Sequence, residues 1–197
     1  MLFNSLTYAI FLPLVFALYW FVLRRELKLQ NLLILISSYV FYGWWDWRFL
    51  TLIFISTLVD FIAGWQINQS EEQKRRKLWV TISIVFNLSL LGFFKYYNFF
   101  VDSFIDLFAQ FSIALHRPTL AIILPVGISF YTFQTMSYTI DIYRRKMEPT
   151  KDIIAFFAFV SFFPQLVAGP IERASNLLPQ FYTARRFDAE QAKEGLK

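Results

Sequence analysis

Apolar residues form six blocks along the chain, and short charged segments separate most of them. A helix that crosses a lipid bilayer needs about 20 apolar residues, and most of the blocks come close to that length. The pattern therefore predicts an all-α, multi-span integral membrane protein with about five to six membrane helices. The blocks cover residues 6–23, 31–45, 49–67, 78–94, 119–138 and 152–168.

The segment between the fourth and fifth blocks has a different pattern. Asn98, Asp102, Asp106 and Gln110 recur every four residues in a segment that is otherwise rich in Phe, which places one polar stripe on an apolar helix. A helix of this kind lies in the membrane interface more readily than across the membrane. The predicted organisation is four peripheral spans (1–95), an interfacial helix (96–118) and the start of a core region (119–197).

The composition supports the membrane class. The chain is 57% hydrophobic and 21% aromatic, with 25 Phe. A soluble domain of this size could not bury so much apolar surface, because much of its outer layer must stay in contact with water. The chain has no cysteine, which excludes disulfides and thiolate chemistry.

The net charge of +5 is unevenly distributed. With the N-terminus outside, four alternating spans and no crossing by 96–118, the inner loops carry eleven Lys or Arg and the outer loops three. Cytoplasmic loops are enriched in Lys and Arg, so this orientation is the predicted one. The first block has neither a preceding basic residue nor a small-residue cleavage site, so it is predicted to be a retained span. The basic segments adjoin spans and form no soluble basic face, so no nucleic-acid binding is expected.

Motifs of familiar catalytic sites are missing from the sequence. It has no Gly-rich phosphate loop, no GxSxG elbow and no His or Cys set that could hold a metal. The single histidine, His116, lies in a short polar connector. It could act as a lone general base, since histidine titrates near neutral pH. A loop histidine at the membrane surface is the favoured interpretation, because no nucleophile or orienting partner adjoins it.

Two stretches, 124–149 and 161–173, begin as apolar runs and then become polar. In the first, Pro125 and Gly127 predict a helix that is kinked or newly started there. Polar residues then follow at nearly every turn and on several faces. Unsatisfied polar groups are costly in hydrocarbon, so this helix must face other helices or a water-filled cavity.

The second stretch interrupts the block 152–168 with the pairs Pro164-Gln165 and Gly169-Pro170, and Glu172 and Arg173 follow at once. The block could just cross the membrane, or could enter it and return on the same side. Irregular backbone at membrane depth is tolerated where it lines a cavity, which is the favoured interpretation of both stretches. The alternative is close packing in a helix bundle through Pro and small residues.

These residues carry a resemblance to a known family. The stretches "LPVGISFYTFQTMSYTIDIYR", "FFPQLVAGPIER" and "LLPQF" resemble the membrane-bound O-acyltransferase (MBOAT) family. Together with "MLFNSLTYAIFLPLVFALYW" and "SYVFYGWWDWRFL", they are most similar to its bacterial alginate O-acetyltransferase type. The resemblance extends over essentially the whole chain. It implies a partial MBOAT fold in a bacterial cytoplasmic (inner) membrane.

The resemblance also implies a function. Family members pass an acyl group from a cytoplasmic donor, such as acetyl-CoA or an acylated carrier, towards an extracytoplasmic polysaccharide through a central funnel. Periplasmic polysaccharide-modifying proteins would be partners, and no bound cofactor or metal is implied. Arg173 is the candidate for an electrostatic role, although it could instead cap a helix or reach the interface. The candidate residues of the funnel are Pro125, Gln134, Asp141, Tyr143, Gln165, Gly169, Pro170 and Arg173.

In the family, an invariant histidine in a Trp-His context acts as general base on the acceptor hydroxyl. That histidine lies on a later segment, and His116 does not occupy its position. We therefore expect the chain, which ends at Lys197, to be the N-terminal part of such an enzyme. No catalytic residue is expected within it, and alone it should be inactive.

Other functions remain open at this point. A related branch of the family transfers D-alanine to teichoic acid. A transporter would also have broken helices, but no internal repeat is visible, and Asp60 and Asp141 are predicted near span ends, in reach of bulk water. A non-catalytic membrane assembly subunit is the third alternative.

Overall fold

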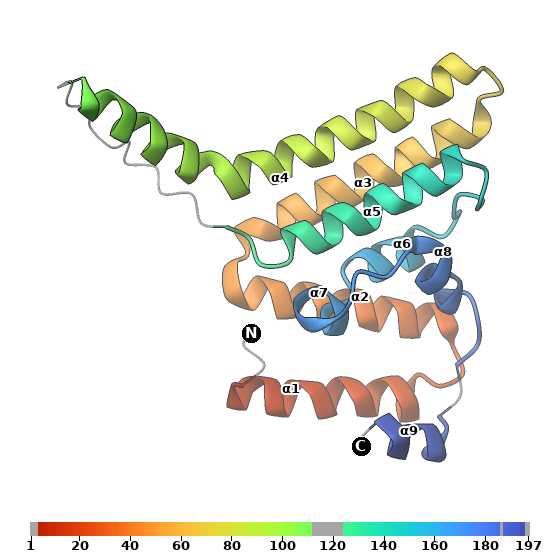
Figure 1. The fold of residues 1–197 in the computed structure, drawn as a ribbon. Helices are drawn as coiled ribbons and strands as arrows, with labels where there is room; N and C mark the ends of the chain where they lie inside the picture. The colour runs from red at the N-terminus through yellow and green to blue at the C-terminus, as the bar shows by residue number, and fades with distance from the viewer. Residues whose placement is uncertain (1–3, 112–123, 186, 196–197) are drawn as a thin grey trace.

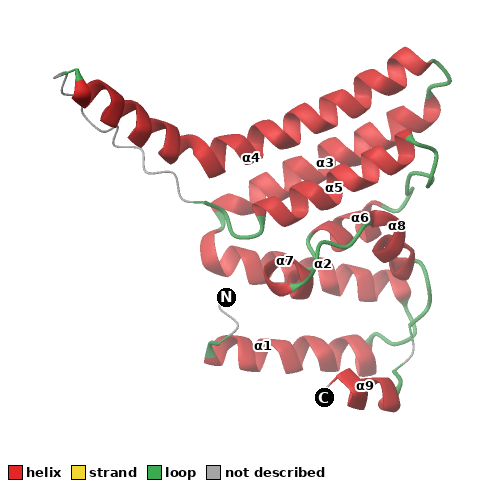
Figure 2. Ribbon diagram, in the orientation of Figure 1, coloured by secondary structure: helices red, strands yellow, loops and turns green. Residues whose placement is uncertain are grey.

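The computed structural model describes residues 4–111, 124–185 and 187–195. Within these ranges all regular structure is helical, with no strand (Figure 2), so the all-α prediction is confirmed. The helices are α1 (Leu6–Ala17) with a π-helical continuation η1 (Leu18–Val22), α2 (Leu27–Asp46), α3 (Arg48–Gln69), α4 (Gln73–Gln110), α5 (Ile128–Tyr143), α6 (Ile153–Val160), α7 (Phe163–Ala168), α8 (Ala174–Leu177), the 3-10 turn η2 (Leu178–Phe181) and α9 (Ala189–Gly195).

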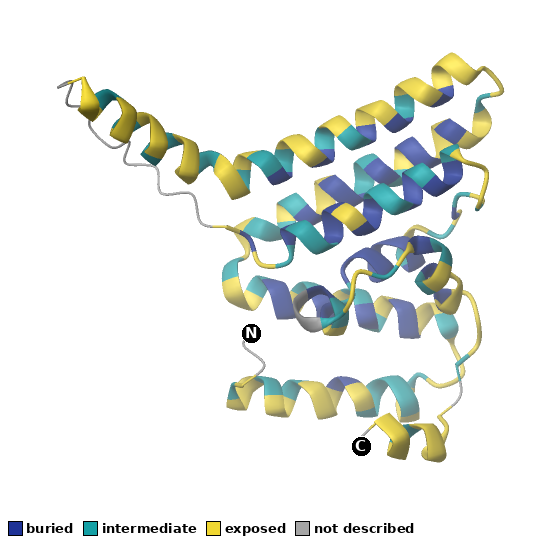
Figure 3. Ribbon diagram, viewed as in Figure 1, coloured by how far each residue is buried: buried dark blue, intermediate teal, exposed yellow. Residues whose placement is uncertain are grey.

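Helices α3, α4 and α5 pack together as one tier of the molecule (Figure 1). Helix α6 lies between this tier and α2, in contact with both α2 and α3, and its residues 155–160 are all buried. Helix α1 lies on the far side of α2, where the rings of Tyr8 and Phe11 contact Phe41. The core therefore sits around α3, α5 and α6, whereas α1 and α9 are mostly exposed (Figure 3).

The three basic segments of the sequence lie at the same end of the helix array (Figure 1). Helices α1, α3 and α5 run towards this end, and α2 and the first half of α4 start from it. At the opposite end, Arg48 forms an ion pair with Asp46 at 2.6 Å. The Arg48 guanidinium holds the pKa of the Asp46 carboxyl below its usual range. The predicted charge asymmetry between the two ends is therefore present in the fold.

Helix α4 is longer than the predicted span 78–94. It runs unbroken for 38 residues, about 57 Å at 1.5 Å per residue, which is roughly twice the thickness of a bilayer core. Its buried residues reach only to Leu91, and the helix changes direction near its middle (Figure 1). The prediction of a separate helix from residue 96 is therefore corrected, because no Pro separates the two halves. Residues 112–118 lie outside the described ranges.

The apolar block 152–168 divides into two helices, α6 and α7, and the break falls at residues 161–162. Pro164, which was expected to interrupt a helix, instead lies in the first turn of α7, where its missing N–H has no helical partner to lose. Helix α6 spans only about 12 Å, well short of a bilayer core. It is a buried core helix, and Ser161 directly after it is also fully buried.

Two helices in the described ranges, α3 and α4, are long and apolar enough to cross a membrane. A core helix of a soluble protein would be mostly buried, yet only 22% of the apolar window of α4 is buried. Other helices also expose large apolar side chains, such as Leu6, which is 80% exposed, and Phe21, which is 62% exposed. Apolar surface on this scale is typical of a protein that contacts lipid or a partner.

Gly64 permits the close approach of α3 and α5. A Cβ at this position would lie 2.5 Å from Cε1 of Tyr138 and 2.9 Å from Cδ1 of Ile142. We expect Gly64→Ala to destabilise the fold by about 1–3 kcal/mol, because the two helices would have to separate. Gly92→Ala is the matched control, since a Cβ there has no neighbour within 4 Å in the described structure. Thermal unfolding should show a loss for the first variant and no loss, or a gain of up to about 1 kcal/mol, for the second.

Candidate functional site

Helix α5, which carries the first polar stretch, begins immediately after Gly127. Gly127 has a φ of 80°, and a Cβ there would lie 2.6 Å from Cδ2 of Leu166. Both the left-handed backbone and the lack of space favour glycine. Pro125 is buried just before this turn, and its carbonyl accepts a hydrogen bond from the Ile128 N–H at 3.3 Å. The predicted helix start is confirmed, and it packs directly on α7.

Polar side chains of α5 bind backbone groups on both sides of the second stretch. Gln134 is 2% exposed, and its Nε2 donates to the Phe159 carbonyl at the end of α6, at 3.1 Å. The Ser137 hydroxyl accepts a hydrogen bond from the Ala174 N–H at the start of α8, at 3.2 Å. These bonds fix α5 against the segments on both sides of the second stretch, and the two stretches themselves meet where Gly127 packs on Leu166.

The turn after α7 brings together three more candidates. Gln165 Nε2 donates to the Pro170 carbonyl at 2.9 Å, which closes the turn. A Cβ on Gly169 would lie 2.8 Å from Cγ of Gln165 and 3.0 Å from its carbonyl oxygen, so a side chain would not fit without movement. Gly169 and Pro170 thus form a tight turn that ends α7.

The last candidates lie apart from that turn. Asp141 is 5% exposed near the end of α5, and the Tyr143 hydroxyl accepts a hydrogen bond from Gln73 Nε2 at 2.9 Å. Arg173 occupies the N-cap position of α8, but its exposed side chain makes no capping hydrogen bond. The predicted funnel residues thus fall into an α6–α7 group, a group at the basic end, and the solvent-facing Arg173. Their roles in catalysis stay predictions, and His116 lies outside the described residues.

Asp60 is the first polar residue whose importance the sequence analysis missed. It was expected near a span end with access to water, but it is fully buried between α3, α4 and α5. Its Oδ1 accepts from the Ser83 hydroxyl at 2.5 Å, and its Oδ2 accepts from Asn87 Nδ2 at 2.8 Å. The Ser83 hydroxyl also lies 2.9 Å from that of Thr139 on α5. The carboxylate therefore joins three helices, and Asp141 is likewise buried, not open to bulk water.

Arg76 is the second such residue. The sequence placed it in a basic loop segment, but it is 4% exposed. Its Nη1 donates to the Ile67 carbonyl at 2.7 Å, and its Nη2 donates to the Ile142 and Tyr143 carbonyls at 3.1 and 2.9 Å. One guanidinium therefore binds the C-terminal carbonyls of both α3 and α5, where helix dipoles favour a cation.

Both residues had a signal in the sequence. The buried positions of α4 follow one another at intervals of three or four residues, as expected for one face of a helix. Those of α3 repeat every three or four residues and include two adjacent pairs, which also define one face. Several of these positions are polar within otherwise apolar helices, which marks groups that need partners. The positions on α4 are Arg76, Val80, Ser83, Asn87 and Leu91.

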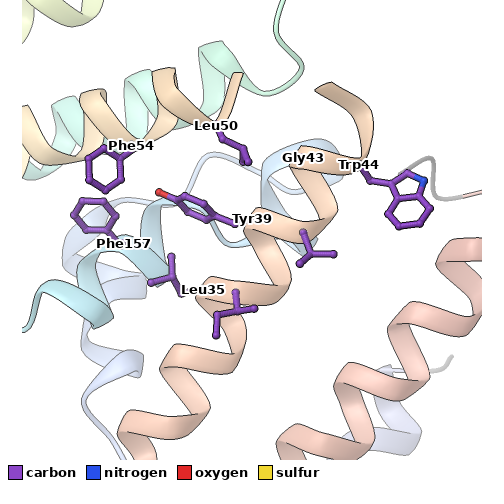
Figure 4. Close-up of a pocket in the computed structure, with 9 residues that line it drawn as sticks. Leu35, Tyr39, Gly43, Trp44, Leu50, Phe54 and Phe157 are labelled. Atoms are coloured by element: carbon purple, nitrogen blue, oxygen red, sulfur yellow. The ribbon is translucent and has the colours of Figure 1, made fainter. Parts of the chain in front are cut away.

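The largest of three cavities found between the helices is apolar. It has a volume of about 590 Å³ and lies between α2, α3 and α6 (Figure 4). Leu35, Tyr39, Phe54 and Phe157 line it, together with other apolar residues and no charged one. Two further cavities have volumes of about 300 and 410 Å³. None of the eight funnel candidates lines any of the three.

Comparison with curated proteins gives similarity over 87% of the chain. The chain is 42% identical over 173 residues to a probable alginate O-acetylase, AlgI, of Pseudomonas aeruginosa. It is 40% identical over 173 residues to the AlgI of Azotobacter vinelandii and 32% identical to a peptidoglycan O-acetyltransferase of Helicobacter pylori. A match of this length in a chain of 197 residues must include the polar stretch of α5.

These O-acetyltransferase relatives confirm the resemblance of the chain to the membrane-bound O-acyltransferase family.

The matched part amounts to 32% of the Pseudomonas relative, 34% of the Azotobacter relative and 36% of the Helicobacter relative. The chain therefore spans about a third of the length of these O-acyltransferase relatives. No family model and no solved structure matches it. Within the described residues, no group of three His, Cys, Asp or Glu side chains could hold a metal ion.

The described helices form a scaffold around α5. The contacts of Gln134, Ser137 and Gln165 fix the relative positions of α5, α6, α7 and α8. Among the eight candidates, Arg173 is a charged residue whose side chain is exposed and makes no capping hydrogen bond to α8.

Proposed function

We propose that the complete protein transfers acetyl groups from a cytoplasmic donor, acetyl-CoA or an acylated carrier, to hydroxyl groups of an extracytoplasmic polysaccharide. The observation that carries this proposal is the 42% identity to an alginate O-acetylase over 87% of the chain. The Helicobacter relative is named for peptidoglycan, so an alginate-like polysaccharide and peptidoglycan are the two acceptor classes to test.

The proposed setting is a bacterial cytoplasmic membrane, crossed about five to six times, with the N-terminus outside. The positions of the basic segments support it. All of them lie at the end of the helix array where α1, α3 and α5 finish, and cytoplasmic loops are enriched in Lys and Arg. The second half of α4 would then lie along the outer interface, because the whole helix is about twice as long as a bilayer core is thick.

Residues 1–197 contain no cysteine, so a cysteine introduced into this chain is not confused with another thiol of the same chain. Ser70→Cys lies at the basic end, and Trp47→Cys lies at the opposite end, where the native side chain is 74% exposed. A membrane-impermeant maleimide applied to spheroplasts should label residue 47 at once and residue 70 only after permeabilisation. The reverse pattern would overturn the orientation, and equal labelling would overturn the spanning arrangement.

In the complete enzyme, a histidine supplied by a later part of the protein would act as general base on the acceptor hydroxyl, which would attack the acyl carbonyl of the donor. The described helices would hold both substrates in proximity and exclude water that would otherwise hydrolyse the donor. Periplasmic polysaccharide-modifying proteins are the proposed partners.

The activity test uses the complete gene product in membrane vesicles with radiolabelled acetyl donor and each acceptor polysaccharide. Label should appear on the polysaccharide, and the chain that ends at Lys197 should transfer none. Incorporation of labelled D-alanine instead would assign the protein to the teichoic-acid branch of the family. Counter-ion-driven uptake of solute with no transfer would indicate a transporter. Absence of both activities would leave a non-catalytic assembly subunit.

We predict that Arg173→Ala lowers acetyl transfer by roughly 100-fold, the scale seen when one group that stabilises developing charge is removed. The unfolding temperature should not change, because the exposed side chain makes no capping bond. Lys77→Ala, which removes another exposed cation, is the matched control and should keep full activity. Equal activity of the two variants would show that Arg173 has no part in the reaction.

A further inference from the structure

The smallest of the three cavities, with a volume of about 300 Å³, lies between α1, η1, α2, α7 and η2. From the α1 side it is lined by Leu12, Val15, Phe16 and Tyr19, which lie on one face of the helix. Leu12 is 40% exposed and Phe16 is 42% exposed, so the cavity is open on this side. Arg185 lines its other end. The cavity therefore combines apolar walls with one cationic end.

The guanidinium at that end is held in place by three hydrogen bonds. Nε donates to the Gln180 carbonyl at 3.0 Å, Nη2 donates to Asn31 Oδ1 at 2.6 Å, and Nη1 donates to the Tyr19 hydroxyl. Asn31 is 1% exposed and is fixed in turn by its bond to the Phe181 carbonyl at 2.8 Å. The position of the Arg185 charge is thus set by three hydrogen bonds, one of them to the buried Asn31.

Arg185 retains the capacity to bind an anion. A guanidinium has five N–H groups, and the three bonds leave two of them without a partner within the described part of the chain. No acidic side chain in that part forms an ion pair with Arg185. A planar guanidinium with two free donors suits phosphate oxygens.

The surroundings select the kind of anion. Tyr19 lies at the cationic end and Trp20 also lines the cavity, and these residue types are enriched where a membrane meets water. The basic segment 24–28 follows directly in the sequence. On the topology proposed above, this is the cytoplasmic leaflet, which carries the anionic lipids. The larger cavity between α2 and α3 offers apolar walls without a charged residue, so it has no means of selecting a headgroup.

We propose that this cavity binds one anionic phospholipid, with an acyl chain between α1 and α7 and the phosphate on the Arg185 guanidinium. The proposal rests on the membrane setting given under the proposed function, but it does not require acyl transfer. A volume of about 300 Å³ is at the low end for small-ligand sites and fits a single chain, with the rest of the lipid outside.

The test compares the full protein in nanodiscs of phosphatidylcholine alone with nanodiscs that also contain phosphatidylglycerol. We expect the anionic lipid to raise the unfolding temperature by roughly 5 °C and to remain bound as one molecule in native mass spectra. Leu12→Trp would fill the cavity from its open side without touching the guanidinium. It should abolish both effects while keeping the unfolding temperature in phosphatidylcholine.

Leu14→Trp is the matched control, because Leu14 is 58% exposed on the same helix and does not line the cavity. It should keep both effects. This control distinguishes lipid binding in the cavity from general attraction of anionic lipid to a chain of net charge +5. Equal stabilisation by both lipids, or an unchanged lipid effect in Leu12→Trp, would overturn the proposal. Lipid binding without acetyl transfer in the vesicle assay would instead overturn only the proposed enzymatic function.

Discussion

Arg76→Ala is expected to destabilise the fold by about 3 kcal/mol or more, among the largest effects of any single substitution in the described chain. The guanidinium donates to the carbonyls of Ile67, Ile142 and Tyr143, and hydrogen bonds to a charged group contribute about 1.5–3 kcal/mol each. Part of this loss is recovered because water can reach the end of the helix bundle. The free energy of unfolding in nanodiscs, followed by tryptophan fluorescence, measures the effect.

Arg75→Ala is the control for the same helix turn. Arg75 is 74% exposed and pairs only with Glu72 at 3.3 Å, so its loss should change stability by no more than about 0.5 kcal/mol. Arg76→Lys should fall between the two, since an ammonium keeps the charge but cannot span both helix ends as a planar guanidinium does. If Arg76→Ala and Arg75→Ala have the same free energy of unfolding, the hydrogen bonds of Arg76 to α3 and α5 do not contribute to stability.

Asp60→Ala is expected to cost about 2 kcal/mol. It would remove one partner from the Ser83 hydroxyl, which keeps Thr139, and one from the Asn87 amide, which keeps the Ser83 carbonyl. Hydrogen bonds to a charged group contribute about 1.5–3 kcal/mol. The Ser56 hydroxyl donates to Asn87 Oδ1 at 3.1 Å, so the disturbance should extend across α3. Hydrogen exchange of the α3 and α4 amides, together with the unfolding temperature, measures both consequences.

Asp106→Ala tests whether any acidic residue would give the same result. Asp106 is exposed on the second half of α4, beyond the last buried residue of that helix, so a change within about 0.5 kcal/mol is expected. If Asp60→Ala behaves like the control, the buried network is not a stabilising element.

The sequence predicted the helices well where apolar residues run without interruption, as in α1, α2 and α3. It misplaced the break in 152–168 because Pro164 can either interrupt a helix or begin one, and only the neighbouring packing of Phe163 and Leu166 distinguishes these cases. It predicted a kink or a helix start at Pro125 and Gly127 because proline and glycine interrupt helices locally, and the structure shows a start directly after Gly127.

The candidate site was less predictable for a different reason. Polarity alone identified Gln134 and Gln165, but their partners, the carbonyls of Phe159 and Pro170, are backbone groups that a sequence does not single out. Asp60 and Arg76 needed knowledge of which faces of α3, α4 and α5 meet. The spacing of the buried positions on α4 indicated which face of that helix packs inward. Counting charges per loop did not use this spacing, so Arg76 was not distinguished from its three basic neighbours.

The hydrogen bonds of Arg76 to both α3 and α5 also have a consequence for the order in which the chain can assemble during translation. The first acceptor of Arg76, Ile67, is nine residues upstream, whereas Ile142 is 66 residues downstream. At about 5–20 residues per second, the ribosome needs roughly 3–13 seconds to make the second acceptor after Arg76 itself. During that interval the Arg76 guanidinium in the α3–α4 hairpin can bind the Ile67 carbonyl but not yet those of Ile142 and Tyr143. The biogenesis of this hairpin therefore includes an obligatory waiting state, and a premature stop between residues 77 and 141 would leave a hairpin that cannot close and becomes a target for membrane quality control.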